Sequence, residues 1–190
     1  MSQLNVNTIG ARTGTNVTVA SGDSLYAAGH IIQVVSTDDA TVASYSLSGT
    51  TPQKLGSLEI SITPKSASSK IYLSTTINGN VTGRYMACCF VRGSTRLGES
   101  DQASGSRSNV FISPVYGEYT DVQYSSLPTS FEYIDSPSTT SATTYYVAMY
   151  RPYGSDTFYY NRPENDTDAA YIYRTRSVFT AMEIAQWKLT

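Results

Sequence analysis

The feature that most constrains the fold of this chain is the alternation of apolar and polar residues in segment after segment. A period of two matches a β-strand, whose successive side chains point to opposite faces, and the segments are rich in the Val, Ile, Thr and Tyr that suit a pleated sheet. No stretch has the periodicity of a helix of three turns. The alternation therefore predicts strands at residues 30–36, 58–63, 70–77, 84–92, 109–113, 130–135, 144–151, 157–161 and 177–187.

Turn-forming residues separate these segments. They are Thr63-Pro64, Asn78-Gly79-Asn80, Arg92-Gly93-Ser94, Ser136-Pro137 and Pro152-Tyr153-Gly154. Their spacing favours antiparallel neighbours rather than the helical crossovers of a parallel sheet. We therefore expect one all-β domain over residues 30–190, an antiparallel β-sandwich that resembles a jelly roll. A chain of 190 residues can bury such a core without metals or disulfides.

Residues 1–29 differ from the rest of the chain because their apolar residues are sparse and glycines interrupt them. The apolar positions alternate like those of a strand, but they are too few to form a core alone. We expect a short extended β segment that packs against copies of itself from sister chains. The alternative is a loosely ordered tail. The candidate contacts between sister chains are Leu4, Val6, Ile9, Val17 and Val19.

The two cysteines, Cys88 and Cys89, are adjacent, and neighbouring residues cannot form a disulfide of normal geometry. We expect two free thiols that act as small buried hydrophobic side chains. In a strand, Cys88 shares a face with Met86 and Phe90, and Cys89 points to the opposite face. The strand at residues 84–92 is thus apolar on both faces, which predicts a central position and a buried Phe90.

The charges are few and balanced: 13 basic and 15 acidic residues give a net charge of −2. No basic patch is present, which disfavours nucleic acid and anionic membranes as partners. The first residues lack the basic start and apolar run of a signal peptide, and no run of about 18 apolar residues occurs. We expect a soluble protein made in the cytoplasm, without membrane insertion.

The sequence offers no catalytic signature. The only histidine, His30, nearly excludes histidine-dependent triads, and no zinc spacing, phosphate loop or dinucleotide fingerprint occurs. We expect no catalytic residue, cofactor or metal. The run Glu164–Asp168 could hold a hard cation such as calcium, although a solvated acidic turn is the simpler interpretation. A carboxylate pair for glycoside hydrolysis remains a minor alternative, drawn from Glu99, Asp101, Glu118, Glu132, Asp135 and Glu183.

Tyrosine is the strongest compositional anomaly, with 16 residues, 12 of them from Tyr116 onward. A tyrosine combines an apolar ring with a hydroxyl, so it either packs within a sheet or contacts sugars and proteins. Tyrosines within the alternating segments, Tyr133, Tyr145 and Tyr171, are predicted to pack. The candidate contact residues lie near glycines, prolines or polar turns: Tyr116, Tyr119, Tyr124 and Tyr153.

Several segments resemble the fibre-like virion proteins of tailed bacteriophages, particularly cyanophages and other marine phages. The matching stretches are Leu4-Asn-Val-Asn-Thr-Ile9, Gly29-His-Ile-Ile-Gln-Val-Val35, Ile62-Thr-Pro-Lys-Ser-Ala-Ser-Ser-Lys-Ile71, Val91-Arg-Gly-Ser-Thr95, Gly105-Ser-Arg107, Phe131-Glu-Tyr-Ile-Asp-Ser-Pro137, Thr144-Tyr-Tyr146 and Met182-Glu-Ile184. Glu183 lies in one of them, within an apolar strand, and should need a buried partner such as Arg107.

The resemblance implies a non-enzymatic structural subunit of the virion that assembles as a homotrimer. The amino-terminal segment would anchor the subunit to other virion proteins, and the sandwich would project from the particle. Two functions follow from the resemblance: a tail-fibre adhesin that contacts a host-surface glycan or protein, or a capsid decoration protein that stabilises the shell. A polysaccharide hydrolase is a minor third possibility.

Overall fold

The structure is a computed structural model, which describes residues 27–81, 83, 85–101, 105–114 and 122–186. The described residues form eight strands and one short 3-10 helix, η1 (Val122–Tyr124). The strands are β1 (Ile31–Asp39), β2 (Ala43–Ile62), β3 (Lys70–Val81), β4 (Ala87–Arg92), β5 (Thr95–Leu97), β6 (Leu127–Asp135), β7 (Thr143–Tyr160) and β8 (Ser177–Ile184). The part of the chain described here contains no α-helix that could span a bilayer.

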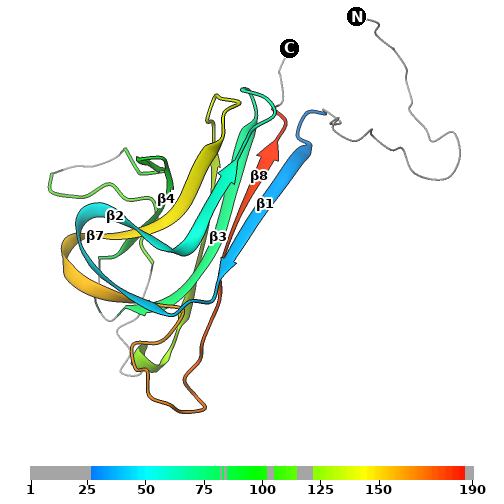
Figure 1. The fold of residues 1–190 in the computed structure, drawn as a ribbon. Helices are drawn as coiled ribbons and strands as arrows, with labels where there is room; N and C mark the ends of the chain where they lie inside the picture. The colour runs from blue at the N-terminus through cyan, green and yellow to red at the C-terminus, as the bar shows by residue number, and fades with distance from the viewer. Residues whose placement is uncertain (1–26, 82, 84, 102–104, 115–121, 187–190) are drawn as a thin grey trace, which may run out of the picture.

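The strands pair antiparallel in two groups of four, β1-β8-β3-β6 and β2-β7-β4-β5. The groups join where Gly79–Val81 of β3 pairs with the end of β7. Figure 1 shows β1 and β8 side by side, with β2 and β7 curving round the other side of the body. This strand order is that of a jelly roll. The all-β antiparallel fold predicted from the alternation is therefore confirmed.

The main core lies between the two four-stranded layers, and strict alternation supplies its side chains. Along β3 and β8 every second residue is buried, as the period of two requires. Three rings from three strands meet in this core: Phe90 lies 4.8 Å from Phe131 and 5.5 Å from Phe179 between ring centroids. Phe90 is fully buried, as predicted.

Strand β4 buries both of its faces. Cys88 joins Met86 and Phe90 in the main core, whereas Cys89 belongs to a second apolar cluster on the outward side of β4 and β7. The prediction of two free, buried thiols is confirmed. Burial raises the pKa of both thiols above the ordinary value, that of Cys89 to about 12. β4 lies between β7 and β5, so it is an interior strand of its layer.

Two predicted turns are in fact parts of strands. Asn78-Gly79-Asn80 lies within β3, where a Cβ on Gly79 would come within 2.4 Å of the Phe158 ring. Pro152-Tyr153-Gly154 lies within β7, at a register shift in the pairing of β7 with β2. The predicted strand at 109–113 is reduced to one bridge, between Ile112 and Cys88.

Glu183 is fully buried in β8, but its partners differ from the predicted arginine. Its carboxylate accepts a hydrogen bond from Gln33 Nε2 at 2.6 Å and another from the Lys65 backbone N–H at 2.7 Å. Arg107 instead lies exposed, on the rim of a surface hollow. The carboxylate thus ties β1 and the β2–β3 connection to β8, so its role is structural.

Candidate functional site

The structure places the candidate contact tyrosines in more than one location. Tyr116 and Tyr119 lie outside the described residues, as do the candidate sister-chain contacts Leu4, Val6, Ile9, Val17 and Val19. Tyr153 packs against Tyr85, whereas Tyr124 packs against Tyr171. The two described candidates therefore belong to two different tyrosine pairs, which are built by different loops.

The first pair borders a surface hollow of about 700 Å³. The Tyr85 and Tyr153 rings meet edge to face, with centroids 5.6 Å apart and an interplanar angle of 86°. Both rings are largely open to solvent, since Tyr85 is 55% and Tyr153 74% exposed. Large apolar rings left in water beside a hollow are typical of a surface that another molecule covers.

The backbone beside this pair is strained at Tyr85 and hydrogen-bonded at the β7 bulge. Tyr85 has a φ of +70°, a left-handed conformation that is unfavourable for an aromatic residue. Strained residues of this kind cluster at functional sites. Gly83 lies against the β7 bulge, where a Cβ would come within 1.3 Å of Asp156 Oδ2. Arg151 fixes that bulge by donating to the Tyr153 carbonyl at 2.8 Å and to the Asp156 carboxylate at 2.6 Å. The β7 bulge that carries Tyr153 is thus held by hydrogen bonds and an ion pair.

The lining of the hollow combines apolar and polar groups. Met86, Val110 and Pro152 supply apolar surface, and the remaining polar side chains are those of Ser106, Arg107, Ser108 and Ser113. Ser113 donates its hydroxyl to the Met86 carbonyl at 3.1 Å, which joins two walls of the hollow. Aromatic rings beside hydroxyls and a guanidinium suit a ligand with both flat apolar and hydroxylated surface, such as a sugar.

The second tyrosine pair joins η1 to the connection between β7 and β8, residues 161–176. This connection is at the opposite end of the body from the start of β1 (Figure 1). Tyr124 of η1 meets Tyr171 at 6.1 Å, and Tyr171 is 59% exposed. Tyr171 was predicted to pack within a strand, which is wrong, because this connection forms no strand. The predictions for Tyr145 and Tyr133 hold: Tyr145 is fully buried, and Tyr133 packs on Phe111.

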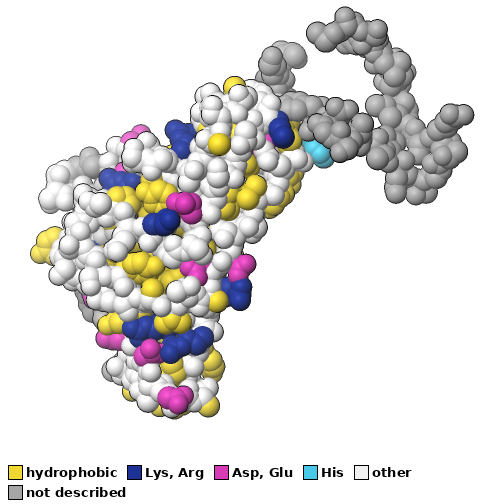
Figure 2. All heavy atoms as spheres, viewed as in Figure 1, with side chains coloured by type: hydrophobic (Ala, Val, Ile, Leu, Met, Phe, Trp, Pro, Cys, Tyr) yellow, Lys and Arg dark blue, Asp and Glu magenta, His cyan; other side chains and the backbone are white. Residues whose placement is uncertain are grey.

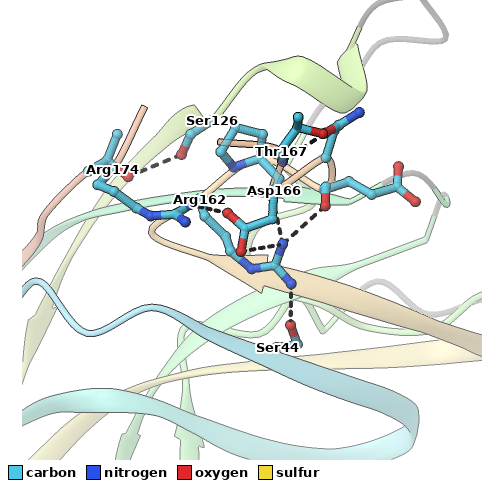
Figure 3. Close-up of polar contacts among 10 residues, drawn as sticks. Ser44, Ser126, Arg162, Asp166, Thr167 and Arg174 are labelled. Atoms are coloured by element: carbon cyan, nitrogen blue, oxygen red, sulfur yellow. Dashed lines mark hydrogen bonds and ion pairs between the residues drawn. The ribbon is translucent and has the colours of Figure 1, made fainter. Parts of the chain in front are cut away.

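The predicted cation loop, Glu164–Asp168, lies in this same connection, and arginines bind its oxygens. Arg162 donates to the carbonyls of Pro163 and Glu164 at 3.1 and 3.0 Å and to Ser44 Oγ at 2.8 Å. Asp166 forms ion pairs with Arg162 and Arg174 (Figure 3). Among the described residues, no three His, Cys, Asp or Glu side chains gather as a metal site requires. The carbonyl and carboxylate oxygens of the loop thus bind arginines, and these contacts hold the loop together.

Four of the carboxylates considered for glycoside hydrolysis, Glu99, Glu132, Asp135 and Glu183, have separate partners. Glu99 accepts from the Tyr150 hydroxyl at 2.8 Å and pairs with Arg96. Asp135 accepts from Arg92 and from the Tyr145 hydroxyl, each at 2.7 Å. The Tyr72 hydroxyl donates to Glu132. Glu183 is held as described above, Asp101 is exposed, and Glu118 lies outside the described residues.

Two observations remain: the position of His30 and the comparisons with known proteins. His30 is exposed in the turn that leads into β1. No protein-family model matches this chain, and no curated protein matches it. The face drawn in Figure 2 carries mostly neutral side chains, with charges of both signs interspersed. The tyrosine-bordered hollow is therefore the best-defined candidate for a binding site.

Proposed function

We propose that this protein is a non-enzymatic structural subunit of a tailed-bacteriophage virion, of the tail-fibre or adhesin type, that contacts the host cell surface. The motifs quoted between Leu4 and Ile184 support the virion assignment, because they resemble fibre-like proteins of such phages. The observation that carries the contact role is the exposed pair Tyr85–Tyr153 beside its hollow. Tyrosine rings offer a large contact area at a low cost in conformational entropy.

A glycan is the ligand that the lining of the hollow suits best. The faces of tyrosine rings cover the C–H surface of a sugar ring, while serine hydroxyls and a guanidinium bond to its hydroxyls. The two rings that border the hollow are exposed to solvent, as expected for a site that takes part of a larger surface polymer. The low net charge places no strong restriction on the charge of that polymer.

The test is binding of the full-length protein to an array of microbial surface glycans. We expect the double variant Tyr85→Ala/Tyr153→Ala to lose more than about tenfold in affinity, because two exposed anchor rings are removed. The matched control is Tyr171→Ala/Tyr173→Ala, which removes two similarly exposed rings at the far end of the body. Loss of binding in the control alone would move the contact site to that end.

The second candidate is a capsid decoration protein, and one observation favours it. Val34 and Ile134 are more than half exposed on the outward face of the β1-β8-β3-β6 layer. A decoration protein is expected to bury such apolar surface against the shell. An electron cryo-microscopy map of the particle separates the candidates, since it places the chain on the tail or on the capsid and shows which surface is covered.

The homotrimer belongs to the same proposal. It is supported by the alternating residues of the amino-terminal segment, Leu4, Val6 and Ile9 above all, and by the fibre resemblance. Light scattering on the full chain and on a chain that starts at Gly29 tests it. We expect a trimer for the full chain and a monomer for the shortened one. A monomeric full chain would contradict assembly in solution.

A further inference from the structure

An apolar row crosses the outward face of the β1-β8-β3-β6 layer. The row consists of Val34 in β1, Met182 in β8, Tyr72 in β3 and Ile134 in β6, which the strand pairing places directly opposite one another. Both ends of this row are largely exposed, Val34 by 54% and Ile134 by 56%. Their sequence neighbours on the other face fill the core, so the row itself points away from it.

The apolar row is confined to the end of the layer at which β1 begins. Beside it lie Ile31, which is 47% exposed, and its partner Ile184. On the other side the next row is polar, formed by Ser36, Thr180, Ser74 and Glu132. Figure 2 shows hydrophobic side chains exposed next to the histidine, His30, at which the chain enters β1.

The entry of the chain at this end is fixed by hydrogen bonds. The backbone N–H of Gly29 donates to the Ala185 carbonyl, and that of Ala185 donates to the His30 carbonyl, both at 2.9 Å. The His30 N–H donates to the Ala27 carbonyl, which closes a turn, and Gly29 has the φ of +77° that such a turn requires. Ala27 therefore lies at the end of the layer that carries the apolar row, and the chain that precedes it begins there.

The length of the preceding chain fits the row. The eight residue-to-residue steps from Val19 to Ala27 span at most about 26–29 Å when extended. Four neighbouring strands span only about 14 Å. Val17 and Val19 are two positions apart, so an extended chain points both side chains to the same side. Gly22, between them and the turn, permits the bend that a chain crossing a sheet needs.

We propose that residues 17–25 fold back over the apolar row of their own chain, with Val17 and Val19 packed on it. The tether keeps this segment at an effective concentration near the millimolar range, which favours its own body over that of a sister chain. Leu4, Val6 and Ile9, beyond Gly10 and Gly14, then remain available for assembly. The proposal does not depend on the glycan site or on the virion assignment.

Disulfide trapping in the full-length chain tests the proposal. A disulfide requires Cα atoms about 4.4–6.8 Å apart, so it reports close approach. We would combine Val19→Cys with Val34→Cys or with Ile134→Cys, at the two ends of the row. The matched control is Val19→Cys with Ser48→Cys, an exposed position on β2 in the other layer. The natural thiols, Cys88 and Cys89, do not compete because both are buried and their pKa values are raised.

We expect an oxidised, intrachain disulfide between Val19→Cys and at least one end of the row, formed about tenfold faster than the control disulfide. That ratio corresponds to a preference of about 1.4 kcal/mol. Non-reducing gels and peptide mapping distinguish it from a disulfide between chains. A disulfide between chains, equal rates at the row and at Ser48→Cys, or no disulfide at the row would each overturn the proposal. Thermal unfolding of the reduced variants checks that each one is folded.

Discussion

The two layers of the jelly roll differ in what covers their outward faces. Outside β4 and β7, a second cluster of Ala87, Cys89, Val91, Ala148 and Tyr150 is covered by Val110 and Phe111. Outside β8 and β3, by contrast, Val178 and the apolar row are in part open to solvent among the described residues. The part of one layer formed by β4 and β7 is therefore covered on both faces by described residues, whereas β3 and β8 in the other layer are covered on one face only.

This difference explains two sequence patterns within one fold. β4 is apolar at five successive positions, Ala87 to Val91, and each of them is buried. β8 alternates strictly, with Val178 exposed between the buried Ser177 and Phe179. A continuous apolar strand thus marks the part of a layer that a loop covers, whereas alternation marks strands with one face toward solvent. Four experiments test this contrast, from the largest expected effect to the smallest.

The largest effect is expected on the inward side of β4. Phe90→Ala removes a fully buried ring that contacts Phe131, Phe179 and Phe111. The free energy of unfolding, measured by urea denaturation, should fall by about 3–5 kcal/mol. A loss below about 1 kcal/mol would show that the two layers do not meet at this ring.

The next effect is on the outward side of β4. Val91→Ala removes two methyl groups beneath the covering loop, where Val91 is buried. Each buried carbon contributes about 0.8 kcal/mol, and the cavity left behind adds to the loss. The free energy of unfolding should therefore fall by about 2 kcal/mol. An unchanged urea midpoint would mean that the loop does not exclude water from this face.

The third experiment concerns Asp39, the last residue of β1, which connects the two layers. Its carboxylate accepts from the backbone N–H groups of Thr41 and Ser57, each at 2.7 Å. Burial alone would raise its pKa, but these hydrogen bonds outweigh burial and lower the pKa below the ordinary value of 3.8. A lowered pKa stabilises the fold above pH 3.8, and this contribution is lost as the pH falls through the folded-state value.

We therefore expect Asp39→Asn to destabilise the protein by about 1 kcal/mol at pH 7, because a charge-assisted acceptor is lost. The difference from the unsubstituted protein should shrink when unfolding is measured near pH 3. Both proteins share every other carboxylate, so their difference isolates Asp39. A difference that stays constant with pH would assign the loss to packing rather than to charge.

The smallest effect is expected from Val178→Ala, the same substitution as Val91→Ala but on the open layer. Val178 is 40% exposed, and an exposed position away from special features typically changes stability by less than about 0.5 kcal/mol. Urea denaturation of both variants gives the comparison directly. An equal fall in the free energy of unfolding for Val91→Ala and Val178→Ala would contradict the distinction between the covered and open faces.

Much of the fold could be predicted from local alternation, and its exceptions have long-range causes. The buried and exposed positions of β3 and β8 follow the period of two. Pro152 and Gly154 indicate a turn locally, yet pairing with β2 carries β7 through them as a bulged strand. Gly79 also suggests a turn, but its missing side chain is needed because the Phe158 ring packs there. Local turn propensity does not report either contact.

The candidate site was predicted only in part, for the same reason. Tyr153 stands out in the sequence because it lies between Pro152 and Gly154. Tyr85 has no such signal: it is one tyrosine at the start of an apolar segment, and its partner is distant along the chain. The arginines that hold the Glu164–Asp168 loop are visible in the sequence, but only the folded connection shows that they occupy its oxygens.

The hydrogen bonds between Gly29, His30 and Ala185 have a consequence for engineering. They bring the first and last described parts of the body to one corner, so a short linker from residue 186 to residue 27 would close the chain. The connection at residues 161–176 lies at the opposite end of the body, and new termini opened there would point away from that corner (Figure 1). A circularly permuted body of this kind would present a fused peptide at the far end.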